Sequence, residues 1–213
     1  MRFKLLKLCI LLLIFIGSNC FAQEPLEALF TGIAEHDVAV VSSYLRRGLS
    51  ADSADIKGNT LLQMTARTGD LPMVNALLSF KANPKLRNAL GETALMLAAV
   101  EGHVEVVRRL IDAGSDINGE GWTALHYAAW KGHLEVCKLL MSKGADIDAR
   151  GPNGITPVMM AVRGGDLETV KWLVWEVADL EVQTIDGATA LSWAEKFDLK
   201  EIAAHLRQAG AKH

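Results

Sequence analysis

Histidine and cysteine are the residues of this chain to consider first as metal ligands or catalytic groups. His103, His126 and His133 lie near the middle of the sequence, and Cys137 follows them closely. No Cys-x-x-Cys pair, Ser/His/Asp arrangement, nucleotide-binding glycine loop or carboxylate pair with a reason for a shifted pKa accompanies them. The sequence therefore predicts no catalytic residue, no metal ligand and no cofactor. The alternative is an enzyme or metal protein, which bound zinc or loss of an activity on mutation of His126 would favour.

A recurring phrase, Gly-x-Thr-x-Leu, indicates which elements hold these residues in place. It begins at five glycines, with Val158 in the last position of one copy: Gly58, Gly91, Gly121, Gly154 and Gly187. The intervals are 33, 30, 33 and 33 residues. A fixed period of this size is typical of stacked supersecondary units rather than of one closed core. The sequence therefore predicts a solenoid.

One copy shows what each position in the unit does. Thr123 is suited to cap a first helix over residues 124–131, and His126 can reach back to it as in a capping box. Gly132 ends that helix in a left-handed conformation. A second helix is expected over 134–142, with a buried stripe formed by Val136, Cys137, Leu139 and Leu140. Gly144 closes it.

The unit resembles an ankyrin repeat in its segments Thr-Ala-Leu-His (123–126), Lys-Gly-His (131–133) and Lys-Gly-Ala-Asp (143–146), and the resemblance covers about residues 24–211. It implies an all-α ankyrin-repeat solenoid of stacked helix-turn-helix units joined by β-hairpin loops, called fingers below. It also implies that His103, His126 and His133 bond to backbone between units. The expected repeats are 24–56 as the N-terminal cap, 57–87, 88–118, 119–150, 151–183, and 184–211 as the C-terminal cap. In the first, the expected core face is Leu29, Val40, Val41 and Leu45.

Two departures from the pattern are expected to have structural consequences. The 30-residue interval, at Asn118-Gly119-Glu120, predicts a finger three residues shorter than its neighbours and a notch in the row of loop tips. Val177, and more mildly Lys81, stand where other units have a left-handed glycine. A β-branched residue adopts that conformation at a cost. Either the fourth full repeat ends its second helix differently, or strain is stored there.

The N-terminus has the order of a secretory signal. Arg2, Lys4 and Lys7 precede the apolar run Leu8–Ile16, and cleavage is expected after Ala22, leaving the domain 23–213. A retained anchor or a lipoprotein signal ending at Cys20 is the alternative. Cleavage removes three of 22 basic residues and none of the 25 acidic ones, so the net charge becomes −6. This charge argues against binding to nucleic acid or to an anionic membrane.

The cysteine content bears on where the protein is expected to be located. Cys9 and Cys20 leave with the signal, so Cys137 is the one thiol of the exported chain, and no internal disulfide can form. It replaces an aliphatic residue and should behave as a small hydrophobe. No Asn-x-Ser/Thr acceptor occurs. A bacterial periplasmic location is therefore expected, with secretion as the alternative.

The resemblance also implies that finger tips and the exposed side of each first helix form a free, concave face. Trp122 and Trp130 stand out there as partner anchors. In the other interpretation, they lean on adjacent helices and fill gaps beside the short finger. Trp172 and Trp193 are expected to be structural, and Trp175 to lie on the outer side. A polar rim is expected from Arg67, Glu92, Glu101, Lys131 and Arg163.

The function expected from these features is that of a non-catalytic scaffold or helper which holds a protein partner in the cell envelope. The sequence does not identify that partner, and a monomer without nucleic acid or membrane contact is expected. Two alternatives stay open: an inhibitor or immunity protein for an exported enzyme or toxin, and a secreted host-interaction factor.

Overall fold

The computed structural model describes residues 25–212, so the expected signal peptide, 1–22, lies outside the described residues. Residues 25–34 are helical, and eleven further α-helices follow, with one short 3-10 turn. They are α2 (Val38–Arg46), α3 (Leu61–Thr68), α4 (Leu71–Ser79), α5 (Ala94–Val100), α6 (Val104–Asp112), α7 (Ala124–Lys131), α8 (Leu134–Ser142), η1 (Pro152–Gly154), α9 (Pro157–Gly164), α10 (Leu167–Trp175), α11 (Ala190–Lys196) and α12 (Lys200–Gln208).

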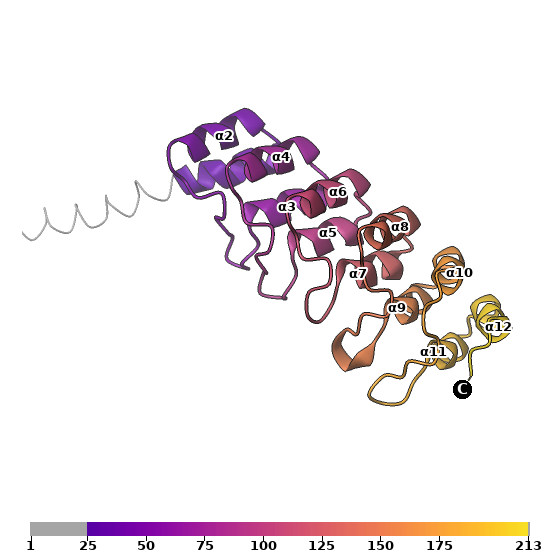
Figure 1. Ribbon diagram of the computed structural model, residues 1–213. Coiled ribbons are helices and arrows are strands. Elements are labelled where there is room, and N and C mark those ends of the chain that lie inside the picture. The colour runs from indigo at the N-terminus through magenta and orange to yellow at the C-terminus, as the bar shows by residue number, and fades with distance from the viewer. Residues whose placement is uncertain (1–24, 213) are drawn as a thin grey trace, which may run out of the picture.

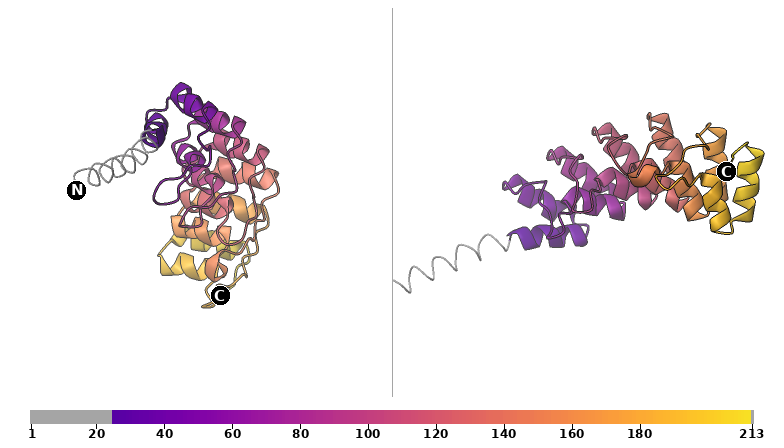
Figure 2. Two further views of the ribbon diagram at one scale, coloured as in Figure 1. Left: turned by 90° about the vertical axis from the view of Figure 1, so that its left-hand side faces the viewer. Right: turned by 90° about the horizontal axis from the view of Figure 1, so that it is seen from below.

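The helices stack in two rows (Figure 1). In the inner row, α3, α5, α7, α9 and α11 each pack on the next, and each also packs on the outer-row helix that follows it in the chain. The long loops between units project to one side as fingers, and the views in Figure 2 show a bowed, elongated array. The predicted all-α solenoid is confirmed. None of the helices within 25–212 has the length and apolar character needed to cross a membrane.

Threonine begins every helix of the inner row. Thr60, Thr93, Thr123, Thr156 and Thr189 are the N-cap residues, each with extended backbone. A capping box forms at α3, α5, α7 and α11, in which the third helical residue bonds back to the cap. The predicted bounds of both helices in the third full repeat, 124–131 and 134–142, match α7 and α8.

A continuous apolar core runs between the rows, from Leu29 to Leu206. Within it Val136, Cys137, Leu139 and Leu140 are buried as predicted. In the first unit Leu29, Val41 and Leu45 are buried, but the prediction for Val40 was wrong, because its side chain is 36% exposed. The reason is positional: α2 is the first described helix of the outer row, so no outer helix precedes it.

Among residues 25–212 the fingers expected as β-hairpins form no ladder, and they turn back by isolated backbone bonds. Within the described residues the one isolated bridge joins Ala54 and Thr60. Elsewhere, the Asn88 amide donates to Glu92 O (3.0 Å) and the Thr184 amide to Ala188 O (2.9 Å). The short finger is confirmed, since residues 113–123 join α6 to α7 whereas 143–156 join α8 to α9. Arg87 reaches across to it, donating from Nη2 to Glu120 O at 3.3 Å.

Strain is stored where the second helix of two repeats ends, which settles the alternative left open by the sequence. Val177 and Lys81 both have φ of 67°, in the left-handed region, while Gly114 and Gly144 occupy the equivalent positions elsewhere. The second helix of the fourth full repeat therefore ends like its neighbours, with valine in a conformation that favours glycine. Such a residue costs of order 1–2 kcal/mol.

Replacing Val177 by glycine is expected to raise the free energy of unfolding by about 1 kcal/mol, since the strain disappears while an 81% exposed side chain loses little packing. Urea denaturation of the two proteins measures the difference. The matched change Gly144→Val, at the equivalent turn, should lower stability by a similar amount. A Val177→Gly protein no more stable than the original would contradict the strain.

Candidate interaction surface

The fingers and the C-terminal ends of the inner helices lie on one side of the molecule, here called the groove face. Its positions are the residue before each capping threonine and those seven and eight after it: Asn59, Arg67, Thr68, Glu92, Val100, Glu101, Trp122, Trp130, Lys131, Ile155, Arg163, Gly164, Ala188, Lys196 and Phe197. Helical periodicity explains the choice, because the residue seven positions after a cap lies about two turns further along the same side of the helix, and the eighth follows it at the helix end. A hollow of about 280 Å³ opens beside Arg67, with Met64 and Leu97 in its lining.

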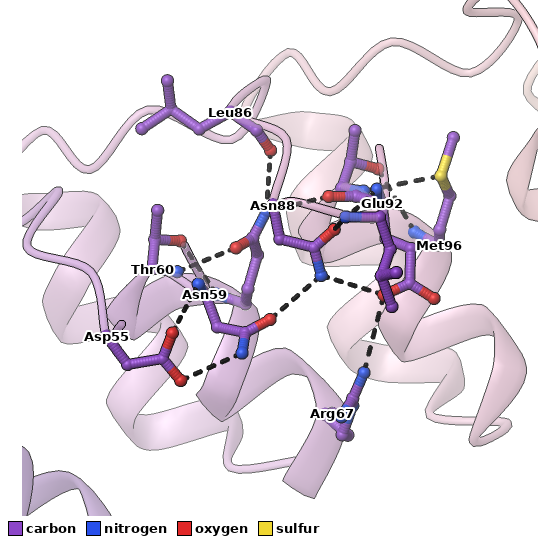
Figure 3. A network of polar contacts seen from close by, with 11 residues as sticks. Asp55, Asn59, Thr60, Arg67, Leu86, Asn88, Glu92 and Met96 are labelled. Atoms are coloured by element: carbon purple, nitrogen blue, oxygen red, sulfur yellow. Dashed lines mark hydrogen bonds and ion pairs between the residues drawn. The ribbon is translucent and has the colours of Figure 1, made fainter. Parts of the chain in front are cut away.

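Two of the predicted rim residues face one another. Arg67 Nη2 lies 3.7 Å from Glu92 Oε2, and the Glu92 side chain is only 13% exposed. Asn88 Nδ2 donates to Glu92 Oε2 and to Asn59 Oδ1, both at 2.9 Å (Figure 3). Asn59 in turn donates to Asp55, and this bond holds the Asp55 pKa below its ordinary value. The Arg67–Glu92 pair therefore joins helix α3 to the next finger, and the Asn88–Asn59 bond joins two fingers.

A buried glutamine and histidine repeat this joining role, and the sequence analysis missed the glutamine. Gln63 Oε1 accepts from the Thr60 amide (2.8 Å), while its Nε2 donates to the carbonyls of Leu86 and Glu92 (both 2.9 Å). His126 does the same with one ring: Nδ1 accepts from the Thr123 amide (3.2 Å), and Nε2 lies 3.0 Å from Ile155 O. The sequence pattern that could have identified Gln63 was present, because Gln63 and His126 both stand three positions after a capping threonine.

The prediction that His103, His126 and His133 bond to backbone between units is confirmed. Nε2 of His103 lies 3.0 Å from Arg67 O, and Nε2 of His133 lies 3.0 Å from Val100 O, so each ring bonds to the preceding unit. Burial lowers the pKa of His126, which favours its neutral form. Across the part of the chain that the structure describes, no group of three or more His, Cys, Asp or Glu side chains is placed to hold a metal ion.

The paired tryptophans are half-buried and lean on their neighbours. Trp122 meets the His126 ring edge-on at 5.3 Å and packs so closely on the next finger that a Cβ on Gly151 would lie 2.9 Å from its ring. Trp130 packs against the core, and Lys131 Nζ lies 4.4 Å from the centre of its ring. These contacts are the ones expected if both tryptophans lean on adjacent helices and fill gaps. The role of both residues as partner anchors stays a prediction.

The remaining predicted residues are exposed. Glu101, Lys131 and Arg163 are on the surface, and no ion pair joins them to any residue within 25–212. Trp172 and Trp193 pack partly against the core, as expected. Trp175 is 75% exposed, on the outer row.

The fold and the groove face define a helical-repeat scaffold with an open side, and comparison with known proteins identifies the family. Family models described as ankyrin repeats match residues 29–119, 61–151 and 131–174. The chain belongs to the ankyrin-repeat family, whose repeats form scaffolds for protein–protein interaction.

Individual relatives share only part of their length with this chain. NF-kappa-B inhibitor alpha of Homo sapiens is 29% identical over 110 residues, which are 48% of this chain and 33% of that protein. An ankyrin repeat protein of Coxiella burnetii is 32% identical over 101 residues, 43% of this chain and 30% of that protein. The chain thus spans about a third of the length of these relatives.

Proposed function

We propose that this chain is an exported ankyrin-repeat protein that binds a protein partner in the cell envelope through its groove face, without catalysing a reaction. The observation that carries the proposal is the open groove face itself. Its charged side chains at Glu101, Lys131 and Arg163 are exposed, and its aromatic ones at Trp122 and Trp130 are half-exposed on a rigid scaffold. A preordered surface loses little conformational entropy on docking, so modest contacts give useful affinity.

The signal-like segment 1–22 supports the envelope as the place of action. We expect these residues to export a reporter phosphatase that is active only after its disulfides form. A fusion without them should stay inactive. Activity that is the same with and without residues 1–22 would contradict export.

A photoreactive amino acid on the groove face tests the partner directly. Placed at Glu101, it is expected to give a discrete protein adduct in intact cells on illumination. The control is the same residue at Lys138, which lies on outer helix α8 and pairs there with Glu135 at 2.7 Å. Equal adducts from both positions, or none from Glu101, would contradict use of the groove face.

Inhibition of a specific enzyme or toxin is the second candidate, favoured by the similarity to a protein named as an inhibitor. It differs from the first in one measurable respect. A purified adduct partner with an enzymatic activity should lose that activity at a one-to-one ratio, whereas a scaffold would leave it unchanged.

A further inference from the structure

Three cations that form no ion pair within residues 25–212 gather toward the C-terminal end of the groove face: Lys131, Arg163 and Lys196, here called the cationic end. All three side chains are exposed, and they come from the successive inner helices α7, α9 and α11. None makes an ion pair with another described residue. Their charges are therefore available to a ligand.

The acidic groups nearby offset this charge only in part. Asp198 pairs with Lys200 at 3.8 Å, and Glu195 pairs with Arg207. Asp186, at the tip of the last finger, feels the charge of Lys196, and the Asp166 carboxylate lies beside Gly132, the residue after Lys131. Glu101 occupies, one repeat earlier, the position that corresponds to Lys131. The cationic end thus keeps an excess of positive charge on a chain whose overall net charge is −3.

The other half of the groove face has no such excess. There the guanidinium of Arg67 faces the carboxylate of Glu92, and hydrogen bonds extend from that carboxylate through Asn88 and Asn59 to Asp55 (Figure 3). A charge that is neutralised within the chain contributes little to the field that a partner meets. The two halves of the groove face therefore differ in electrostatic character.

Aromatic surface accompanies the free cations. The Trp130 ring lies beneath Lys131, and Trp193 and Phe197 stand edge to face at 6.1 Å on α11. The Phe197 side chain is 44% exposed. Large aromatic side chains beside charges are typical anchors at protein interfaces, because they bury apolar area and the charges orient the partner.

On the basis of the proposed function, we propose that the cationic end receives an acidic, extended segment of the protein partner, with apolar side chains between its carboxylates. Arg163 and Lys196 occupy the same position on packed neighbouring helices, whose axes are about 10 Å apart. A segment in the extended polyproline II conformation has three residues per turn and rises about 3.1 Å per residue, so carboxylates three residues apart lie on one face and reach both cations. Apolar residues next to these carboxylates meet Trp130, which lies on the helix before Arg163, and Phe197, which follows Lys196.

Fluorescence anisotropy with a labelled peptide of repeated Glu-Thr-Val triplets, about twelve residues long, tests this directly. The unaltered chain is expected to bind it, more weakly as salt is raised, and to bind the matching Lys-Thr-Val peptide at least tenfold more weakly. The double variant R163E/K196E should lose about tenfold or more in affinity for the acidic peptide and prefer the basic one.

Two controls separate position from net charge. K138E/K171E makes the same charge change on the outer helices α8 and α10, and should bind the acidic peptide as the unaltered chain does. R67Q should also bind normally, because Glu92 already neutralises Arg67.

Three outcomes would overturn the proposal: no binding of the acidic peptide, equal binding by R163E/K196E, or tighter binding of a single-stranded DNA of similar length. Each is distinct from failure of the proposed function. If the Glu101 photoadduct persists in R163E/K196E, the groove face binds a protein by other contacts, and only the acidic segment is wrong.

Discussion

Replacing His126 by alanine is expected to lower the free energy of unfolding by about 3 kcal/mol. The ring is fully buried, and its removal leaves the Thr123 amide without its partner and opens a cavity. The Ile155 carbonyl loses one of its two bonds and keeps the one from the Gly151 amide. Glutamine should retain most of the stability, since Gln63 already makes the equivalent bonds in another repeat. Urea denaturation measures all three proteins. Equal losses for alanine and glutamine would contradict the bonding role.

Replacing His126 should also change how the free energy of unfolding depends on pH. Burial lowers the pKa of His126 in the folded chain, so the unfolded chain takes up this proton first, near the ordinary value of 6.5. The contribution of neutral His126 is therefore complete above that pH and lost as the pH falls below it, by up to about 1.4 kcal/mol per unit. His126→Gln is expected to have a flatter stability profile between about pH 6.5 and 5, and an identical profile would contradict this.

Replacing Gly164 by alanine should cost about 2 kcal/mol, although alanine normally favours a helix over glycine. A Cβ at Gly164 would lie 2.0 Å from the backbone oxygen of Trp130, so helix α9 would have to move away from α7. This inner pair makes the most extensive helix contact of the array, while the outer helices α8 and α10 touch only slightly. The close approach therefore bends the array at this point.

Thermal unfolding checks this prediction, with Glu101→Ala as the control. Glu101 is exposed and occupies the position equivalent to Gly164 two repeats earlier, so its change should leave the melting temperature nearly unaltered. A Gly164→Ala protein as stable as the original would show that the two helices separate at no cost.

The fold could be predicted from the sequence because its determinants are local and repeated. Thr123, Gly132 and Gly144 fix the start and end of helices by capping and by left-handed turns, and recurrence of the pattern gives the stacking. Even the strain at Val177 was detectable, because the position is glycine in other units. The burial of Val40 was wrong because it depends on a neighbouring helix that the first unit lacks.

The groove face was predicted less well, because exposure and pairing are properties of neighbouring repeats. Arg67 and Glu92 belong to different repeats, 25 positions apart, and no feature of either repeat alone shows that their side chains meet. The contact between Trp122 and Gly151 likewise depends on how closely two fingers pack. Arg163 was identified by its position, but only the structure shows that no described acid forms an ion pair with it.

The most direct test of the account is to block the groove face chemically and measure binding of the partner identified by the Glu101 adduct. In a chain that begins at residue 23, Cys137 is the one native thiol. It is fully buried and burial raises its pKa to about 12, so a thiol reagent will label only an introduced cysteine. Glu101→Cys carrying a bulky maleimide is expected to bind the partner at least tenfold more weakly than the same variant unlabelled, while labelled Lys138→Cys binds normally. Undiminished binding by labelled Glu101→Cys would contradict recognition through the groove face.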